Sequence, residues 1–356
     1  MIKVKIYGAG SIGNHYAYAC YKKKWNITII DKDPKALVRM EKKIFPSRYG
    51  FWDKKIKLLS KDVNTYFDII IIGTPPESHL KLAIKNLKDK NRPKVLQIEK
   101  PLCTPDLKNL KEFIKLKNKY KSKVKIFGGY NHLLTENTKI AEKILKKEKF
   151  GKFLGLNSYN NEEWSGIFNA HFWLKSPKDS YLGFLKRGGG ALCEHSHGLA
   201  AWLHYSKYLK LGNIKKVYAK MKLIKKNSLF YDQTSILTLE TTKGFVGTVF
   251  QDTITKPALK KLRIQFSNGY LETYVNYKNN LDAVIYECNN KKKEYFIKKS
   301  RTDDFKGMVN HLGESLKNKK LQKLSAVSIT RSIETMKIIN TAFKSNQLKK
   351  EISKKI

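Results

Sequence analysis

Six residues close to the start of the chain, Gly8-Ala9-Gly10-Ser11-Ile12-Gly13, constrain its fold more than any other feature. They follow the strand-like run "IKVKIY" and precede a helical pattern, and a second strand-like run, "NITII", leads to Asp31. A GxGxxG turn between a strand and a helix, with an acidic residue roughly 20 positions further on, is the fingerprint of a dinucleotide-binding unit. The sequence therefore predicts a strand–helix–strand unit of this type at the N-terminus.

The residues of this turn have separate physical roles in binding a dinucleotide. Gly8 permits the tight turn, Gly10 lets the backbone approach a pyrophosphate at the helix N-terminus, and Gly13 allows close packing of helix on strand. Asp31 can accept hydrogen bonds from an adenosine ribose and would repel a 2′-phosphate, which favours NAD over NADP. Lys32 beside it weakens that argument, and a glycine turn without a ligand is the structural alternative.

The pattern of apolar runs divides the chain into two domains. Over residues 1–130, runs such as "DIIII" and "KVLQI" alternate with helical patterns. This predicts a doubly wound α/β domain of the Rossmann type, with a parallel sheet covered on both faces. Over residues 131–356, a helical stretch near 135–149 and a strand near 152–161 precede strand-like runs joined by turns such as "TTKG" and "SNG". We expect an α+β domain with an open, mostly antiparallel sheet, followed by helices near 303–318 and 328–345.

The chain is strongly basic, with 72 Lys and Arg against 30 Asp and Glu and a net charge of +42. Such a surface attracts polyanions, but only seven of the basic residues are arginines and the lysines are scattered through every segment. Nucleic-acid sites also use arginine for bidentate and stacking contacts, so a nucleic-acid partner is not expected. The positive field would instead steer an anionic substrate such as a sugar phosphate or a nucleotide sugar.

Membrane and secretion signals are not expected in this chain. No apolar run approaches the roughly 18 residues of a membrane-spanning helix, and strand-like alternation begins at residue 2, which leaves no room for a signal peptide. The four cysteines are far apart and form no CxxC pair, as expected of reduced thiols. These features predict a cytoplasmic protein.

The stretch "KRGGGALCEHSHGLAAW", residues 186–202, holds an unusual density of titratable groups. A helix that starts after the three glycines would place Glu194 and His197 on one face, because residues three apart are neighbours on a helix. A carboxylate beside an imidazole suits acid–base work. Cys193 and His195 complete a cluster that could suggest a metal, but four adjacent residues on one helix cannot converge on one ion, so no metal is predicted. A structural helix histidine is the other alternative for His197.

Four motifs together resemble the Gfo/Idh/MocA oxidoreductases, the relatives of glucose–fructose oxidoreductase and inositol dehydrogenase. They are the glycine turn, "GTPPESH" ending at His79, the "EKP" of Glu99-Lys100-Pro101, and the GGG-x-x-[DE]-x-x-H pattern of residues 188–197. The stretch "WLKSPKDSYLGFLKRGGG" is similar to members from surface-sugar and sialic-acid-like gene clusters. Glu194 departs from the Asp of many members, and "GGYNHLLT" lacks the Arg and Pro often found after that strand.

The resemblance implies an NAD-dependent dehydrogenase or reductase that moves a hydride between nicotinamide and a hydroxyl-bearing carbon. The implied substrate is a sugar, sugar phosphate, nucleotide sugar or polyol. The implied base is His197, with Lys100 hydrogen-bonding the same oxygen and Glu194 binding a substrate hydroxyl or orienting the imidazole. The glycine turn and Asp31 are then joined in cofactor binding by Ser11, Ile12, Thr74, Pro75, His79, Glu99 and Asn131.

The sequence leaves two other functional classes open and also predicts an oligomer. A cofactor-binding sensor or assembly protein of the same fold, without catalysis, is an alternative to the enzyme, and a polyanion-binding protein is a second one. The structural alternative for Lys100 is a solvated charge at the end of a strand. Runs such as "SILTLE" and "FVGTVF" carry apolar residues on both faces of the strand, more than a one-sided sheet needs. We therefore expect a homodimer or homotetramer.

Overall fold

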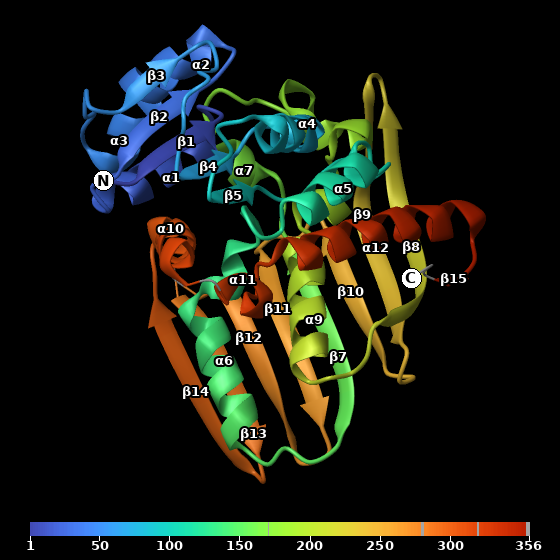
Figure 1. The fold of residues 1–356 in the computed structure, drawn as a ribbon. Helices are drawn as coiled ribbons and strands as arrows, with labels where there is room; N and C mark the ends of the chain where they lie inside the picture. Colours follow the sequence, from blue (N-terminus) through green and yellow to red (C-terminus); the bar gives the residue numbers. More distant parts are fainter. Residues whose placement is uncertain (170, 279–280, 319, 354–356) are drawn as a thin grey trace. The chain divides into compact units, whose positions relative to one another are not determined.

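Two sheets organise the chain, one in each of its two structural units (Figure 1). The structure is a computed structural model, and it describes residues 1–169, 171–278, 281–318 and 320–353. The first unit consists of residues 1–103, 107–131 and 301–330. The second unit consists of residues 104–106, 132–300 and 331–356.

The sheet of the first unit has six parallel strands. They are β1 (Lys3–Tyr7), β2 (Asn26–Ile30), β3 (Lys57–Leu59), β4 (Ile69–Ile72), β5 (Val95–Ile98) and β6 (Lys125–Gly128). Their order is β3-β2-β1-β4-β5-β6. Strands β2 and β3 are added on one side of β1 and strands β4 to β6 on the other, so the strand order switches between β1 and β4. All four residues of β4 are buried, as in a strand covered on both faces. This confirms the predicted doubly wound domain.

Helices cover both faces of this sheet. They are α1 (Ser11–Lys22), α4 (Pro76–Lys88), α5 (Leu110–Lys119), α10 (Arg301–Lys317) and the short α11 (Leu321–Leu324). Gly13 of α1 lies next to Ile6, whereas Asn86 of α4 is hydrogen-bonded to Tyr7. Because adjacent residues of a strand point to opposite faces, α1 and α4 lie on opposite sides of the sheet. Helix α10 packs against α1, and α5 packs against α4.

A helix of mixed type connects β2 to β3. It runs from α2 (Pro34–Arg39) through a π-helical turn, η1 (Met40–Ile44), into α3 (Phe45–Tyr49), and it ends at Gly50 with a φ of 81°. Pro46 explains the π turn. It has no N–H, and in a regular α-helix its ring would press on the carbonyl four residues earlier, so the preceding turn widens.

Residues 301–330 pack with the first unit, although the sequence-based division places them in the second domain. Phe305 of α10 stacks on His15 with ring centroids 4.6 Å apart and meets Tyr16 edge-on at 5.0 Å. Near the end of β6, Gly128 donates a backbone hydrogen bond to Val327. The helical pattern predicted α10 itself, but periodicity does not say which sheet a late helix covers.

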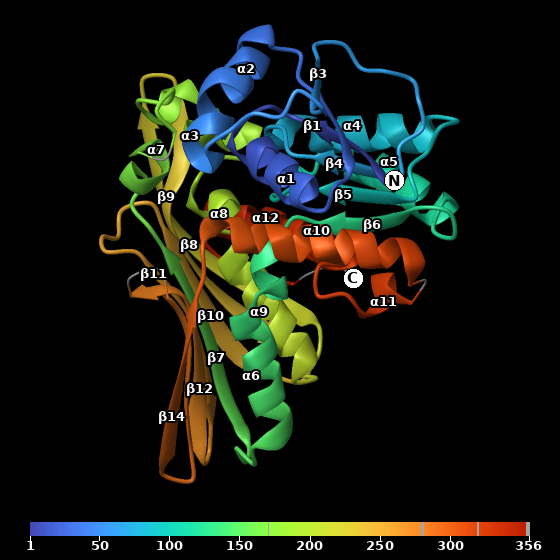
Figure 2. The same ribbon diagram turned by 90° about the vertical axis from the view of Figure 1, so that its left-hand side faces the viewer.

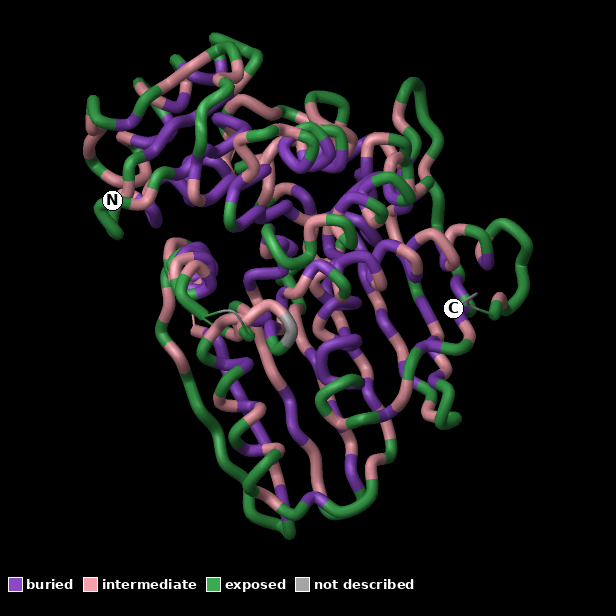
Figure 3. Tube along the Cα trace, in the orientation of Figure 1, coloured by how far each residue is buried: buried purple, intermediate pink, exposed green. Residues whose placement is uncertain are grey.

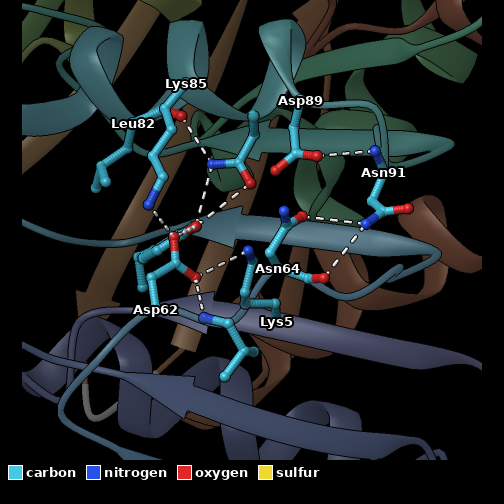
Figure 4. Close-up of polar contacts among 10 residues, drawn as sticks. Lys5, Asp62, Asn64, Leu82, Lys85, Asp89 and Asn91 are labelled. Carbon is cyan, nitrogen blue, oxygen red and sulfur yellow. Dashed lines mark hydrogen bonds and ion pairs between the residues drawn. The ribbon is translucent and has the colours of Figure 1, made fainter.

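A partly buried ion cluster joins β1 to the loop before β4 and to α4 (Figure 4). The Lys5 side chain is 5% exposed, and its Nζ lies 3.1 Å from Asp62 Oδ1. Asp62 also accepts hydrogen bonds from the Tyr7 hydroxyl at 2.6 Å and from Lys85 at 2.5 Å. Burial lowers the pKa of Lys5, and the charge of Lys85 lowers it further, whereas the bond to Asp62 compensates part of the desolvation of the ammonium group.

The sheet of the second unit has nine strands, in the order β14-β13-β12-β11-β7-β10-β9-β8-β15. Their bounds are β7 Phe153–Asn161, β8 Ile214–Lys226, β9 Leu229–Thr241, β10 Val246–Asp252, β11 Leu259–Phe266, β12 Gly269–Lys278, β13 Leu281–Cys288, β14 Lys291–Lys298 and β15 Ile352–Ser353. Every pair is antiparallel except β7 with β10. The predicted open, mostly antiparallel sheet is confirmed.

One face of this sheet carries helices. Figure 2 shows α6 (Glu136–Lys147) and α9 (His197–Tyr208) on the same side of the strands, and α12 (Ile329–Leu348) ends the helical part of the chain. Buried and partly exposed residues alternate along the central strands (Figure 3). Tyr218, Ile236 and Val246 project from the other face and are 41%, 44% and 52% exposed. Among the described residues, no helix combines the length and hydrophobicity needed to cross a membrane.

Candidate functional site

The glycine turn lies between β1 and α1 and leaves space above the helix. A Cβ atom at Gly13 would lie 1.8 Å from the carbonyl oxygen of Gly8, so only glycine allows this approach of helix to strand. A Cβ atom at Gly10 would meet no atom within 4 Å. Gly10 is the N-cap of α1 and offers no side chain to cover the first N–H groups of the helix. These features fit a diphosphate bound at the helix N-terminus.

Asp31 follows β2 and is tied to the glycine turn. One of its carboxylate oxygens accepts the Ala9 N–H at 2.8 Å, and the other accepts the Asp33 N–H at 3.0 Å. Each carboxylate oxygen has two acceptor sites, so these bonds fix Asp31 and leave capacity for ribose hydroxyls. The structure thus orients Asp31 at the edge where the sequence places the adenosine ribose.

The turn between β4 and α4 holds Thr74, Pro75 and His79. Pro75 is the N-cap of α4, and the Thr74 hydroxyl is hydrogen-bonded to Ser78 at 2.6 Å. The His79 ring is buried, with Nε2 2.6 Å from the Thr74 carbonyl and Nδ1 2.9 Å from the Pro101 carbonyl. Burial lowers the pKa of His79, and a neutral imidazole has a single N–H to share between the two carbonyls. His79 therefore ties this turn to the segment after Lys100.

Glu99 is a buried anchor at the end of β5. One of its carboxylate oxygens accepts the Tyr16 hydroxyl at 2.6 Å and the Gln97 amide at 2.9 Å, and the other accepts the Lys100 N–H at 3.1 Å. Burial raises the pKa of Glu99. Gly129 approaches so closely that a Cβ there would lie 2.5 Å from the Glu99 carboxyl carbon. These contacts fix the backbone from which Lys100 projects.

Asn131 is the last of the predicted cofactor residues along the chain. It is buried and begins the 3₁₀ turn η2 (Asn131–Leu134), directly after the first unit's last strand and Tyr130. The structure therefore gathers all the predicted cofactor residues in the first unit. They lie in the turns that follow the carboxyl ends of β1, β2, β4, β5 and β6, which is where open parallel sheets bind ligands.

The GGG segment of the second unit leads into two short helical pieces and not into one helix. Helix α8 (Ala191–Glu194) ends at Glu194 and α9 begins at His197. The expectation that both residues share one face of a regular helix is therefore wrong. The His195 carbonyl at the break accepts Gly198 N–H at 3.0 Å and the buried side-chain amides of Asn160, at 2.9 Å, and Gln251. These amides hold the carbonyl at the turn between the helices.

Glu194 and His197 have different partners in this arrangement. The Tyr181 hydroxyl donates to Glu194 at 2.7 Å. The His197 ring stacks on His132, with centroids 4.0 Å apart and an angle of 20° between the planes. A small pocket with a mixed polar and apolar lining adjoins this pair, and Asn160 and Lys260 are among its polar residues. No aspartate or glutamate lines the pocket among the described residues. The pocket therefore suits a ligand that is polar or anionic.

A buried carboxylate, Asp232 on β9, supports the start of α8. It accepts the Leu192 N–H at 2.7 Å and the Ser235 hydroxyl at 2.6 Å. A Cβ atom on Gly190 would lie 1.9 Å from its second oxygen, which explains why the last of the three glycines has no side chain. Burial raises the pKa of Asp232 to about 6.

Sequence reasoning missed Asp232, Asn160, Gln251 and His132. Around Asp232 the sequence shows a strand-like alternation of apolar and polar residues, interrupted by a single acid, and this pattern only weakly indicates a functional residue. The two amides give none, because their partner is a backbone carbonyl distant in sequence. Within the described residues, no group of three or more His, Cys, Asp or Glu side chains is arranged to hold a metal ion.

Known proteins share this fold and, over the first unit, this sequence pattern. Residues 2–127 match the family profile described as an oxidoreductase family with an NAD-binding Rossmann fold, Gfo/Idh/MocA. No curated protein matches the chain by sequence. Many solved structures share the fold.

Three of these structures cover the whole chain at low identity. An oxidoreductase from Agrobacterium radiobacter, solved with NAD⁺, L-tartaric acid and magnesium, has a TM-score of 0.73 at 14% identity and covers 99% of this chain and 98% of its own. The WlbA dehydrogenase from Bordetella pertussis, solved with NADH and UDP-GlcNAcA, has a TM-score of 0.71 at 15% identity and covers 100% and 99%. Levoglucosan dehydrogenase, solved with NADH, has a TM-score of 0.74 at 15% identity and covers 99% of each chain.

The glycine turn, the acid after β2 and the strand order point to the same cofactor as the family profile. Residues 2–127 therefore resemble the NAD-binding Rossmann domain of the Gfo/Idh/MocA oxidoreductases, and the chain over its whole length shares its fold with structures solved with NAD⁺ or NADH.

Proposed function

We propose that the substrate is a sugar or sugar derivative whose hydroxyl-bearing carbon exchanges a hydride with NAD(H). When bound, NAD⁺ accepts the hydride and NADH returns it. The observation that carries the proposal is the His132–His197 pair beside a pocket whose described lining residues include Asn160 and Lys260 but no aspartate or glutamate. Two proteins of the same fold support a ligand of this class. WlbA was solved with a nucleotide sugar, UDP-GlcNAcA, and levoglucosan dehydrogenase is named for a sugar substrate.

His197 is the proposed proton acceptor for the substrate hydroxyl. Its imidazole lies 4.0 Å from that of His132, centroid to centroid. The stack and the fixed His195 carbonyl hold the start of α9 in place, as a positioned base requires.

Lys100 and Glu194 have supporting roles in the proposal. Lys100 follows β5, and its ammonium group would stabilise negative charge that develops on the substrate oxygen. Glu194, held by the Tyr181 hydroxyl, would accept a hydrogen bond from a substrate hydroxyl. Both ring nitrogens of His79 lie against backbone carbonyls, so His79 would fix the shape of the turn that holds the cofactor and would not contact the cofactor directly.

The proposal is tested by following NADH absorbance with a panel of nucleotide sugars, sugar phosphates, uronic acids, hexoses and polyols. We expect NAD⁺ reduction or NADH oxidation with at least one of them. His197→Ala should then lower turnover by about 10²–10⁴-fold, the usual value of positioned acid–base catalysis, with unchanged affinity for NADH. His204→Gln is the matched control. His204 lies on the same helix but is bonded to Glu142 and Arg331, so its loss should change turnover by less than about 3-fold.

Two results would contradict the proposal. An enzyme with His197→Ala and near-normal turnover would remove His197 from the chemistry. Tight NADH binding without turnover of any member of the panel would instead favour the non-catalytic cofactor-binding protein that the sequence left open.

We further propose that a second copy of the chain covers the open face of the nine-stranded sheet. Tyr218, Ile236 and Val246 leave apolar surface on that face, on the adjacent strands β8, β9 and β10, and Ile236 lies opposite Phe250. A single exposed apolar residue needs no explanation, but a contiguous group on a flat sheet is typical of a protein–protein interface.

A further inference from the structure

Two of the seven arginines of the chain lie beside the N-terminal end of α1. Arg48 of α3 donates from Nη1 to the Ser11 carbonyl at 3.3 Å, and the same nitrogen lies 3.4 Å from His15 Nε2. Tyr49, the next residue, places its hydroxyl 2.7 Å from the other ring nitrogen of His15. The end of α3 is therefore fastened to the first two turns of the helix whose N-terminus receives the cofactor.

The π turn before α3 determines which residues of α3 face α1. One extra residue in a helical turn rotates everything that follows by about 100° around the axis. Pro46 causes this widening, as described above, and the chain leaves the helix at Gly50. Without the π turn, Arg48 would point about one residue further around the helix, away from Ser11. The irregularity therefore has a consequence at the cofactor turn.

Arg301 approaches the same place from α10. Phe305 packs on His15 and Tyr16, and further along α10 Gly313 packs on Trp25, which follows α1. Helices α1 and α10 therefore run parallel, and the first residue of α10 lies near the first turn of α1. The Arg301 guanidinium is 5.5 Å from the centre of the Phe305 ring. Asp304 is 3.5 Å from one of its nitrogens and neutralises part of its charge.

The two arginines raise the positive potential at this corner of the first unit. Burial lowers the pKa of Arg48, and the nearby charge of Arg301 lowers it further. The N-termini of α1 and α10 add the positive ends of two helix dipoles, partly offset by the acidic first turn of α10. Arg48 is half-buried and Arg301 is exposed, and two cations that repel each other are stabilised by an anion between or above them.

We propose that Arg48, with Arg301 beside it, binds the diphosphate of NAD(H) from the side of α1 that faces away from the sheet. The family profile and the glycine turn account for backbone contacts to the cofactor, and neither assigns these side chains. A guanidinium suits the role because its planar fork can hold two phosphate oxygens at once. The 2′-phosphate of NADP is the competing ligand, but Asp31 stands where that group would approach, so the diphosphate is favoured.

The inference rests on the NAD binding of the family and not on the proposed sugar substrate. The test therefore measures binding alone, by the fluorescence of NADH titrated into the full chain with no sugar present. Arg48→Gln should raise the Kd for NADH by about 10-fold, which corresponds to about 1.4 kcal/mol. Arg48→Lys should lie between this variant and the wild type, because an ammonium group retains the charge but not the fork. Arg301→Gln should weaken binding by roughly 3-fold, since Asp304 already neutralises part of its charge.

Arg92→Gln is the matched control in the same unit. Arg92 is bonded to the Leu87 carbonyl and stacks on Tyr120, with its guanidinium carbon 4.3 Å from the ring centre. It should leave the Kd for NADH within about 2-fold of the wild type. Raising the salt concentration should weaken NADH binding less in Arg48→Gln than in the wild type, because one phosphate–cation contact is missing.

Fragments of the cofactor locate the contact. ADP-ribose retains the diphosphate without the nicotinamide, so Arg48→Gln should weaken its binding by the same factor. Adenosine has no phosphate and should bind equally to both proteins. An equal loss of adenosine affinity, or a lower unfolding temperature of the ligand-free variant, would mean that Arg48 only supports His15 and Tyr49. A loss confined to NADPH would assign Arg48 to the 2′-phosphate. Either outcome overturns the inference.

Discussion

At the scale of single residues, the burial of Asp232 lowers the stability of the folded chain at neutral pH. Its position beside the GGG segment, where it accepts the Leu192 N–H, explains why the residue is nevertheless buried there. Its carboxylate is fully buried, and burial raises its pKa to about 6 from an ordinary value of 3.8. Between these two values the unfolded chain has lost the proton that the folded chain still holds. The contribution of Asp232 to stability is therefore complete below about pH 4 and is lost as the pH rises to about 6. The chain retains an ionised group that a neutral one could replace with a gain in stability.

Asp232→Asn tests this pH dependence. The unfolding free energy of the variant, relative to the wild type, should rise between pH 4 and pH 7 by an amount of up to about 3 kcal/mol, since one pKa unit corresponds to about 1.4 kcal/mol. Urea unfolding at pH 4.5 and 7.5 measures it. Loss of the carboxylate that accepts the Leu192 N–H can lower the unfolding free energy equally at both pH values. The comparison therefore uses the change in unfolding free energy between the two pH values. Identical slopes in the two proteins would contradict the prediction.

At the scale of elements, the break between α8 and α9 depends on two amides of the sheet beneath it. Asn160 on β7 and Gln251 on β10 are partners across the parallel strand pair, and both donate to the His195 carbonyl. This contact fixes the start of α9 and with it the His197 ring. Misplacing a catalytic group by about 1 Å can lower a rate by roughly 100-fold, so the sheet contributes to the proposed chemistry without touching the substrate.

Gln251→Leu should therefore lower turnover by roughly 10–100-fold with little change in the Kd for NADH, which binds to the other unit. A lost buried hydrogen bond should also reduce the unfolding free energy by about 1–3 kcal/mol. Gln265→Leu is the control. Gln265 lies on the opposite face of the sheet, bonded to Arg263, and should leave turnover within about 2-fold. Equal effects of the two substitutions on turnover would indicate general destabilisation.

The same elements show how far the sequence could be interpreted. The apolar runs and the glycine turn are local signals, and they were enough to predict the doubly wound sheet with most of its strands and helices, but not β3, the helix before it or the place of α10 on this sheet. The histidine motif was recognised, but its geometry was wrong. A helix break produced by Asn160 and Gln251 depends on side chains that come close only after the strands have paired. The π turn before Arg48 had a local signal in Pro46, but its effect on α1 required the packed structure.

At the scale of the whole molecule, the proposed pairing of two copies gives a mass that can be measured. Light scattering at micromolar concentration should yield the mass of a dimer or a tetramer. Ile236→Lys places a charge on the open face of the sheet and should shift the mass toward the monomer while NADH binding persists. Val38→Lys is the control, because Val38 is similarly exposed, at 50%, but lies on α2 of the first unit. A wild-type monomer would contradict the proposal.

The first unit is discontinuous along the chain, and this affects how the protein is made. On the ribosome, α1 emerges early, but the helix that covers its His15 and Tyr16 side chains emerges only after strands β7 to β14 of the second sheet have been synthesised. The nascent Rossmann sheet therefore carries an uncovered aromatic surface throughout translation of the second unit. Arg301 arrives with that same late helix. If Arg301 binds the diphosphate as proposed, the cofactor turn acquires its full positive charge only when α10 has docked, late in synthesis of the chain.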